Sequence, residues 1–295
     1  MDESESTDST DDADGTGNAD STDSTGDADS TGDGESVVIT HPGPEVAVVT
    51  MSRPERLNAM DTTLIEGLYS AFDQIEADGA CRVVILTGAG RGFCAGLDLA
   101  GYGRPPGPTG PSGAQRGMAV QKRIAGLIPR MRALPHPIIA AVNGPAAGGG
   151  LALVLGSDIR LAARTARFIV AFIRVGVSGC DIGTSWLLPR LVGVARAHEL
   201  MLTGREFDAD EALRIGVVTH LFEEGQLMEA ALAKAGELLA HGAWAVSLTK
   251  EAMWASLEIP GLQAAIDLEN RQQILLGTTL ESIGPVGRVF GEPAP

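Results

Sequence analysis

The sequence predicts an α/β fold that ends in a helical region. Short apolar segments of strand length alternate with longer segments whose apolar residues recur at helical spacing. From about residue 226 onward, only amphipathic helical patterns follow. The chain is 44% hydrophobic, so residues 37–295 can bury a large core. This order of elements is typical of an α/β domain with a helical appendage.

A β-hairpin is expected to open the domain. Val37–Thr40 and Val46–Met51 have strand character and are separated by turn residues at positions 42–44. Asp61 then precedes a helical pattern as a candidate N-cap, and Val83–Leu86 is a short buried strand. The apolar residues of that helical pattern are Leu64, Ile65, Leu68, Phe72 and Ile75. Together these segments predict a β-α-β unit.

The middle of the chain begins with a loop. Gly101–Gly113 is rich in Gly and Pro, and a helix is expected from Gln115 to Leu134. Pro129 should kink or break this helix, because an internal proline removes a backbone hydrogen bond. A buried strand, Ile138–Val142, follows.

Two more strand-like segments, Asp158–Ala162 and Arg167–Val170, precede the helical end. The helical patterns lie near residues 194–202, 226–241, 244–257, 260–275 and 278–289. We therefore expect a core over residues 37–225 and a C-terminal helical region over residues 226–295.

The negative charge is concentrated at one end of the chain. Residues 1–36 hold 13 of the 38 acidic residues and none of the 22 Lys and Arg, which leaves 25 acids against 22 bases. This segment has no aromatic or branched aliphatic side chain, so it is expected to be a disordered acidic tail. It is interpreted as a solvating appendage, a partner-recruiting segment or the product of an upstream start codon. The nearly neutral remainder disfavours binding to nucleic acid or an anionic membrane.

The cysteines favour a reducing compartment, because three of them without CxxC spacing do not suggest disulfides. With no apolar run long enough to span a bilayer, we expect a cytoplasmic protein. Cys94 is expected to pack as a small buried side chain rather than to act as a nucleophile. His136 and His198 lack metal-ligand spacing, so no metal is expected.

Two glycine-centred turns follow buried strands: Phe93–Asp98 and Asn143–Gly150. The second opens an apolar helix over Leu151–Leu155, which must be buried and whose first-turn amides have no intrahelical partner. Free amides at a helix N-terminus suit an oxyanion. On composition alone, a tight turn with close helix packing is the simpler interpretation. Neither turn matches a phosphate-binding signature.

Four segments resemble the enoyl-CoA hydratase/isomerase, or crotonase, family. They are Arg53–Met60, Val84–Asp98, Ile138–Asp158 and Leu187–Gly204, so the likeness covers the chain from Val37 onward. The resemblance implies a crotonase-like ββα superhelix with a C-terminal helical trimerisation region, assembled as a homotrimer or homohexamer. It also implies an acyl-CoA thioester substrate and no separate cofactor, since coenzyme A is part of the substrate.

The resemblance also implies site residues. The two backbone amides that hold the thioester oxygen in the family match Leu97 and Gly149. As the thioester becomes enolate-like its oxygen gains negative charge, and one preset donor is worth roughly 3 kcal/mol in the transition state. The residues expected to line the CoA are Arg56, Leu57, Ala95, Leu97, Asp98, Leu99, Gly148 and Gly149.

The sequence departs from the family's hydratases at both catalytic glutamates. Ala152 and Phe172 occupy those positions, and neither side chain can transfer a proton. Losing a general acid or base costs on the order of 10² to 10⁴ in rate, so efficient hydration by the usual mechanism is in doubt. We expect Ala152, Phe172 and Trp186 to line the acyl pocket instead.

Asp181 is the carboxylate that remains near the site. With a one-residue gap it is similar to the aspartate of dienoyl-CoA isomerases and to the nucleophilic aspartate of 4-chlorobenzoyl-CoA dehalogenases. Two interpretations stay open: a catalytic acid/base, or the N-cap of a helix that spans Ser185 to Leu191. A dehalogenase would also need a histidine from the preceding loop, and residues 99–130 contain none.

We therefore predict an enzyme of this family, an enoyl-CoA hydratase or double-bond isomerase that uses a backbone oxyanion hole and a single carboxylate. The rival hypothesis is a non-catalytic acyl-CoA-binding protein that has lost both hydratase glutamates.

Overall fold

The computed structural model describes residues 35–101, 112–223 and 225–277. The predictions for the acidic tail before residue 35, for most of the Gly/Pro-rich loop and for the last helical pattern, 278–289, lie outside these ranges.

The strands of the described residues form two sheets. The larger has six strands in the order β1-β2-β3-β4-β6-β9, parallel except for the antiparallel edge strand β1. The smaller has the order β5-β7-β8. The strands are β1 (Val37–Gly43), β2 (Val46–Met51), β3 (Val83–Gly88), β4 (Ile138–Val142), β5 (Ala146–Ala147), β6 (Ile159–Ala163), β7 (Arg167–Ile169), β8 (Glu206–Asp208) and β9 (His220–Phe222).

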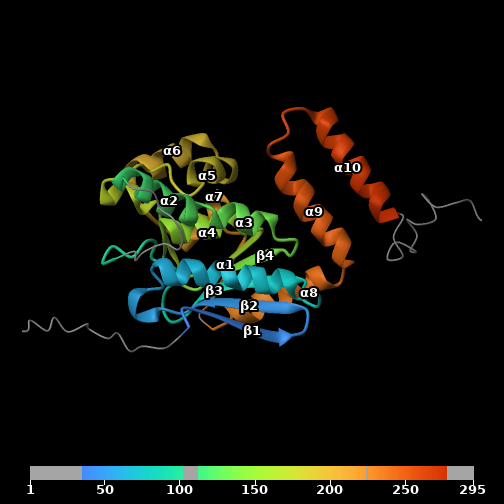
Figure 1. Cartoon of the computed structure of the whole chain (residues 1–295), viewed down its shortest axis with the longest axis horizontal. Helices are drawn as coiled ribbons and strands as arrows, with labels where there is room; N and C mark the ends of the chain where they lie inside the picture. The colour runs from blue at the N-terminus through green and yellow to red at the C-terminus, as the bar shows by residue number, and fades with distance from the viewer. Residues whose placement is uncertain (1–34, 102–111, 224, 278–295) are drawn as a thin grey trace, which may run out of the picture. The chain divides into compact units, whose positions relative to one another are not determined.

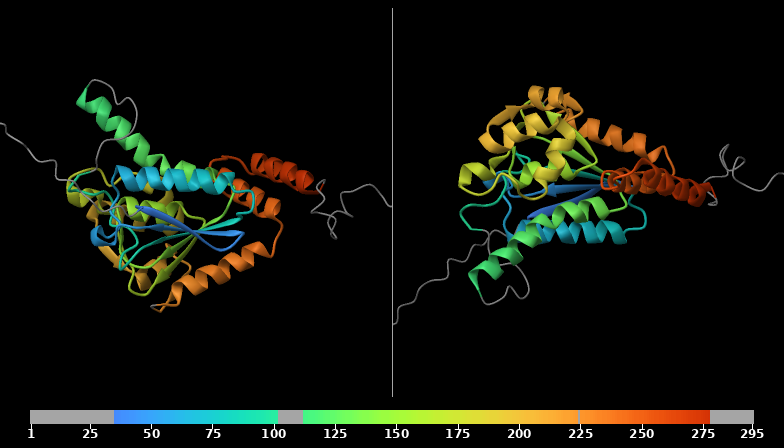
Figure 2. Two further views of the ribbon diagram at one scale, coloured as in Figure 1. Left: turned by 60° about the horizontal axis from the view of Figure 1, so that its bottom comes forward. Right: turned by 90° about the horizontal axis from the view of Figure 1, so that it is seen from above.

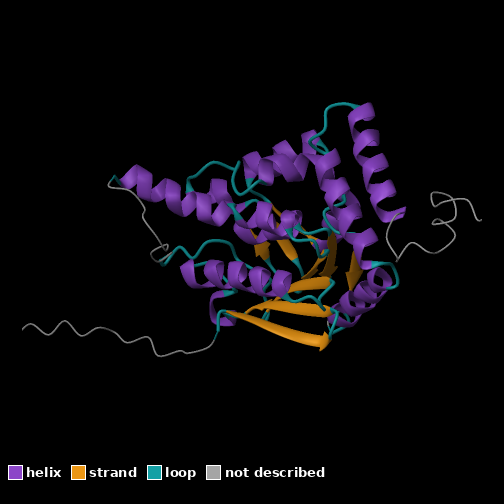
Figure 3. Cartoon of the chain, turned by 45° about the vertical axis from the view of Figure 1, so that its right-hand side comes forward, coloured by secondary structure: helices purple, strands orange, loops and turns teal. Residues whose placement is uncertain are grey.

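Helices connect and cover these strands (Figure 1). They are α1 (Thr62–Ala77), α2 (Gly113–Ala125), α3 (Leu127–Ala133), α4 (Gly149–Gly156), α5 (Thr184–Val192), α6 (Val194–Thr203), α7 (Ala209–Ile215), α8 (Leu227–Leu239), α9 (Ala243–Ser256) and α10 (Leu262–Gly277). Two short 3-10 helices, η1 and η2, span Pro54–Arg56 and Ala171–Val175. Figure 3 shows how the helices surround the strands.

The predicted hairpin and first β-α-β unit are confirmed. β1 and β2 pair antiparallel, and β2 and β3 pair in parallel with α1 between them in the chain. The Asp61 carboxylate accepts the Leu64 N–H at 2.8 Å, as expected of an N-cap. All five predicted apolar positions of α1 are buried.

The predicted break at Pro129 is wrong, because the chain divides into α2 and α3 at Gly126. A Cβ at Gly126 would lie 2.6 Å from the Tyr69 hydroxyl and 3.0 Å from the Lys122 carbonyl oxygen, so a larger residue would collide there. Pro129 is the third residue of α3, where its missing N–H costs no intrahelical hydrogen bond.

The large sheet separates two apolar layers. In β2, Ala47 and Val49 belong to a cluster that includes α1, α3 and α4, whereas Val46 and Val48 belong to a cluster that includes α8. This alternation follows the two-residue period of a strand. Figure 2 (left) shows α1 and α8 on opposite faces of the sheet. The first helix of the predicted C-terminal region therefore completes the core.

A buried ion pair anchors α9 to the core. The Lys250 ammonium lies 3.0 Å from Asp158, with the two side chains 4% and 6% exposed. Lys250 also donates to the carbonyls of Met131 and His136, and the Trp254 indole donates to Asp158 at 2.6 Å. Burial lowers the pKa of Lys250, although Asp158 acts against that shift. Such a pair is stable only because its polar groups are satisfied.

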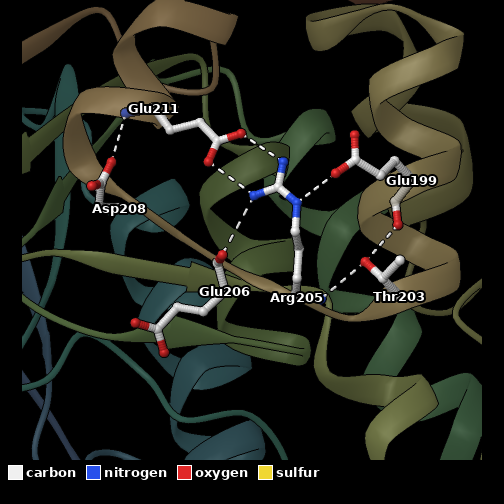
Figure 4. A network of polar contacts seen from close by, with 6 residues as sticks. All are labelled: Glu199, Thr203, Arg205, Glu206, Asp208 and Glu211. Atoms are coloured by element: carbon white, nitrogen blue, oxygen red, sulfur yellow. Dashed lines mark hydrogen bonds and ion pairs between the residues drawn. The ribbon is translucent and has the colours of Figure 1, made fainter.

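A surface network links α6, β8 and α7 (Figure 4). The Arg205 guanidinium contacts the Glu211 carboxylate at 2.7 and 2.9 Å and Glu199 at 2.6 Å. The hydrogen bonds from Arg205 lower the pKa of Glu211. Within the described ranges, no helix is both long and apolar enough to cross a membrane.

Candidate active site

The two glycine-centred turns meet at the carboxyl ends of β3 and β4. Cys94 and Ala146 form an isolated parallel bridge, and the Ala147 N–H donates to the Cys94 carbonyl at 2.9 Å. Gly150 lies so close to this strand that a Cβ on it would be 2.0 Å from the Cys94 carbonyl oxygen. A glycine is therefore required where α4 passes the first turn.

Among the backbone N–H groups of these turns, those of Leu97 and Gly149 have no protein acceptor. Met60 donates to Gly96 at 2.7 Å and accepts from Asp98 at 2.9 Å, which leaves the intervening Leu97 amide unused. Gly149 is the first residue of α4, so its amide has no intrahelical partner. In the described segments, no hydrogen bond from either amide to the protein occurs. A Cβ on Gly96 would lie 3.5 Å from the Gly149 nitrogen, so the two turns are in contact.

The buried side chain of Asn58 supports the first turn. Asn58 is fully buried and has φ of 56°, a left-handed conformation that asparagine tolerates better than most residues. Its oxygen accepts the Arg53 N–H at 2.8 Å. Its amide nitrogen donates to three carbonyls, at 2.8 to 3.2 Å: those of Ala89, Gly92 and Phe93. The Arg53–Met60 motif thus serves to position the strand end that carries Leu97.

An ion-pair cluster fixes the residue after Leu97. The Arg53 guanidinium lies 3.1 Å from both Asp98 and Asp61. Burial alone would raise the pKa of Asp98, but the Ala100 amide and the Arg53 guanidinium outweigh it and hold that pKa below its usual value. Asp98, predicted to line the CoA, is thus committed to an internal contact.

Apolar side chains surround the free amides. A Cβ on Gly149 would lie 3.1 Å from the Met60 sulfur and 3.3 Å from Ile182 Cδ1, and one on Gly148 would lie 3.5 Å from Phe172. Ala152 is fully buried on α4. Developing charge on a bound oxygen would therefore be met by two main-chain donors in a medium of low polarity, where such donors act most strongly.

The Asp181 side chain does not cap a helix. The N-cap of α5 is Gly183, which makes no side-chain cap hydrogen bond, so the capping interpretation is wrong. Asp181 Oδ1 instead accepts the Ile182 N–H at 2.7 Å and a hydrogen bond from the Gln121 amide. Asp181 is half-buried and directly precedes Ile182, whose Cδ1 would lie 3.3 Å from a Cβ on Gly149.

Gln121 is the site residue that sequence reasoning missed. It lies on α2, 60 residues before Asp181 in the chain, and donates its side-chain amide to that carboxylate. No motif or spacing around Gln121 marks it, because only the packing of α2 against the Asp181 loop brings the two together.

Trp186, predicted to border the acyl pocket, stacks against two arginines. The Arg190 guanidinium lies 3.8 Å from its ring centroid and that of Arg132 lies 5.0 Å away. The residue that lies beside Gly149 is Ile182. Helical geometry accounts for the Arg190 contact: residues four apart on a helix share a face, and Trp186 shares its face with Arg190.

The remaining predicted CoA-lining residues divide into half-buried and exposed members. The Ala95 N–H donates to the Leu57 carbonyl at 2.9 Å, so these two residues hold the first turn together. Arg56 is exposed at the end of η1, and Leu99 is 77% exposed. The charge of Arg56 also acts on Asp98, so it lies close to the first turn.

Cys94 is a packing residue, as predicted. It is fully buried, and burial raises the pKa of its thiol to about 12, so it carries no thiolate near neutral pH. Within the described segments, no cluster of three or more His, Cys, Asp or Glu side chains could hold a metal ion.

Comparisons with known proteins agree with this geometry. Residues 43–282 match the enoyl-CoA hydratase/isomerase family model. A probable enoyl-CoA hydratase of Mycobacterium tuberculosis is 41% identical over 81% of this chain and 84% of its own length. The 1,2-epoxyphenylacetyl-CoA isomerase of Escherichia coli is 39% identical over 83% of this chain and 91% of its own.

Solved structures show the same fold. The enoyl-CoA hydratase of Bacillus anthracis superposes with a TM-score of 0.78 at 32% identity, covering 86% of this chain and 95% of that one. A probable enoyl-CoA hydratase/isomerase of Mycobacterium abscessus gives a TM-score of 0.77 at 35% identity, covering 82% and 90%. With its family segments, its fold and its two apposed turns, this chain belongs to the enoyl-CoA hydratase/isomerase family of acyl-CoA enzymes.

Proposed function

We propose that this enzyme moves the double bond of an enoyl-CoA thioester. The observation that carries the proposal is the combination of two free amides, at Leu97 and Gly149, with the half-buried carboxylate of Asp181, the residue before Ile182. Ala152 and Phe172 stand where hydratases of the family have their glutamates, so the pair that activates water is missing. Isomerisation needs only one group that takes a proton and returns it.

The reaction would run in two steps. Asp181 removes a proton from the γ or α carbon, and the electron pair moves through the conjugated system onto the thioester oxygen. The amides of Leu97 and Gly149 stabilise the resulting dienolate, which gains charge only as the proton leaves. Protonated Asp181 then delivers the proton to the other carbon, so no atom is gained or lost.

The same proposal places the coenzyme along the first turn. Its supports are the exposed Arg56 and Leu99 beside Asp98, and we propose no separate cofactor. We also propose a homotrimer or homohexamer in the cytoplasm. The exposed apolar side chains of α9 and α10 and three unpaired cysteines support this, and native mass spectrometry would measure the assembly.

Replacement of Asp181 tests the reaction. We expect Asp181→Asn to lower the isomerisation rate of 3-enoyl-CoA esters by about 10² to 10⁴. The measurements are the absorbance of the conjugated product and deuterium uptake at the α and γ carbons. The matched control is Asp210→Asn, since the Asp210 side chain is 73% exposed and lies on α7. Full activity of Asp181→Asn would refute the role of this carboxylate.

Two further outcomes bear on the reaction. If the wild-type enzyme hydrates 2-enoyl-CoA but does not isomerise 3-enoyl-CoA, the proposed isomerisation is wrong and the reaction is hydration. Tight acyl-CoA binding without any turnover would favour a non-catalytic protein.

A further inference from the structure

The helix that carries Gln121 and the segment that follows Asp181 also line a cavity of about 560 Å³. Ala125, which lines it, lies four residues, or about 6 Å along the helix axis, after Gln121 on α2. Gly183, which also lines it, comes directly after the residue that touches the Gly149 position. The helix of Gln121 and the loop of Asp181 thus both continue into the wall of the cavity.

The walls of the cavity are apolar near Asp181 and charged farther away. They combine side chains of α3 and α5 with the residues that follow α9: Ile128, Arg132, Trp186, Leu187, Arg190 and Glu258. Arg190 lies six residues after Thr184, the first residue of α5, which is about 9 Å along the helix axis. A chain that runs from the reacting carbons along α5 would meet aliphatic groups and an indole ring first, and guanidinium groups last.

The charged end carries an excess of positive charge. Arg132 lies 2.6 Å from Glu258, which neutralises it. Arg190 stacks on the Trp186 ring and donates to the Trp186 carbonyl at 2.8 Å, but no carboxylate in the described ranges pairs with it. These two contacts hold the guanidinium in place, and its other N–H donors make no hydrogen bond to a carboxylate. A planar guanidinium with free donors is matched best by a carboxylate.

We propose that this cavity binds the far end of the acyl group and that this end is a carboxylate. The substrate would be the CoA monothioester of an unsaturated dicarboxylic acid. This inference rests on the proposed function, because Asp181 marks where the reacting carbons lie. The methylene groups pack against Ile128, Leu187 and Trp186, and the terminal carboxylate pairs with Arg190.

The test compares two 3-enoyl-CoA esters of equal chain length, one ending in a carboxylate and one in a methyl group, over a series of lengths. The measured quantity is the ratio of their kcat/KM values. We expect the wild type to favour the carboxylate ester, and Arg190→Gln to reduce that ratio by up to about tenfold, as for the loss of one charged hydrogen bond at an exposed arginine. Arg190→Glu should reduce it further. Arg196→Gln, at an exposed arginine of α6 outside the cavity, is the matched control and should keep the ratio.

Failure of this inference can be separated from failure of the proposed function. Efficient isomerisation of the methyl ester without preference for the carboxylate ester would overturn the inference alone. Equal losses for both esters in Arg190→Gln would also overturn it, since Arg190 would then serve the fold or the coenzyme. If neither ester is turned over, calorimetry decides: tighter binding of the carboxylate ester that depends on Arg190 supports the cavity assignment while the reaction fails.

Discussion

The two halves of the active site are held in different ways. The oxyanion turns lie in the core, where main-chain hydrogen bonds, close glycine contacts and the buried Asn58 fix their backbone. The Asp181 loop is half-exposed, and its carboxylate is held by one neighbouring N–H and one glutamine side chain. The part that stabilises charge is thus built into the fold, whereas the part that moves protons depends on few side chains.

This difference suggests how the family's chemistry varies on one fold. The two oxyanion turns, Phe93–Asp98 and Asn143–Gly150, are called the cradle below. Changing a residue of the cradle disturbs the core, so the cradle tolerates little substitution. Side chains around the acyl group are replaceable one at a time, as Ala152 and Phe172 illustrate at the positions of the hydratase glutamates. Mutations in the two halves should therefore separate stability from turnover.

The largest effect is expected in the cradle. Gly150→Ala would place a Cβ 2.0 Å from the Cys94 carbonyl oxygen, in a backbone that cannot move aside without opening the turn. We expect a loss of about 3 kcal/mol or more in the free energy of unfolding, measured in urea, together with loss of activity.

The matched control is Gly236→Ala, in an exposed part of α8 where a Cβ would contact nothing within 4 Å. It should stabilise the protein by about 0.5 to 1 kcal/mol. Similar effects of the two substitutions would mean that the cradle is not tightly packed.

A smaller effect is expected at the Asp181 loop. Gln121→Ala removes the amide that holds the carboxylate, so we expect about a tenfold lower kcat, a nearly unchanged KM and less than about 1 kcal/mol of stability loss. The ratio of deuterium uptake at the α and γ carbons should change as well, because the Asp181 carboxylate would no longer be held within reach of both carbons.

Lys122→Ala, on the exposed face of the same helix, is the control and should change none of these quantities. An unchanged uptake ratio with a large loss of stability in Gln121→Ala would show that Gln121 serves the fold rather than the carboxylate.

The smallest effect concerns the pH dependence of the cradle. The Ala100 amide and Arg53 lower the pKa of Asp98 against the effect of burial, so its ionised form stabilises the folded state. That contribution is full above the unfolded pKa, near 3.9, and is lost as the pH falls through the lower folded pKa. Asp98→Asn should therefore be about 1 kcal/mol less stable than wild type at pH 7, with the gap closing below about pH 4. A gap that persists at low pH would assign the effect to packing.

Much of the fold could be predicted from local patterns. The two hairpin strands with the turn between them, the apolar positions of α1 and the uniformly apolar α4 were all visible in sequence, and the structure confirms them. Smaller elements were missed: β8, α7 and β9 carry no strong periodicity of their own. Their order is set by pairing with β6 and β7, which lie far away in the chain.

What the sequence by itself determined was the family, the position of the two turns and the absence of the hydratase glutamates. The tertiary structure alone decided that Gly126 divides the helix, that Trp186 faces Arg190 and that Asp181 meets Gln121. The physical reason is the separation along the chain over which each effect acts. Periodicity and turn chemistry act within a few residues, whereas these three outcomes depend on how one element packs against another, and a single sequence does not display such contacts.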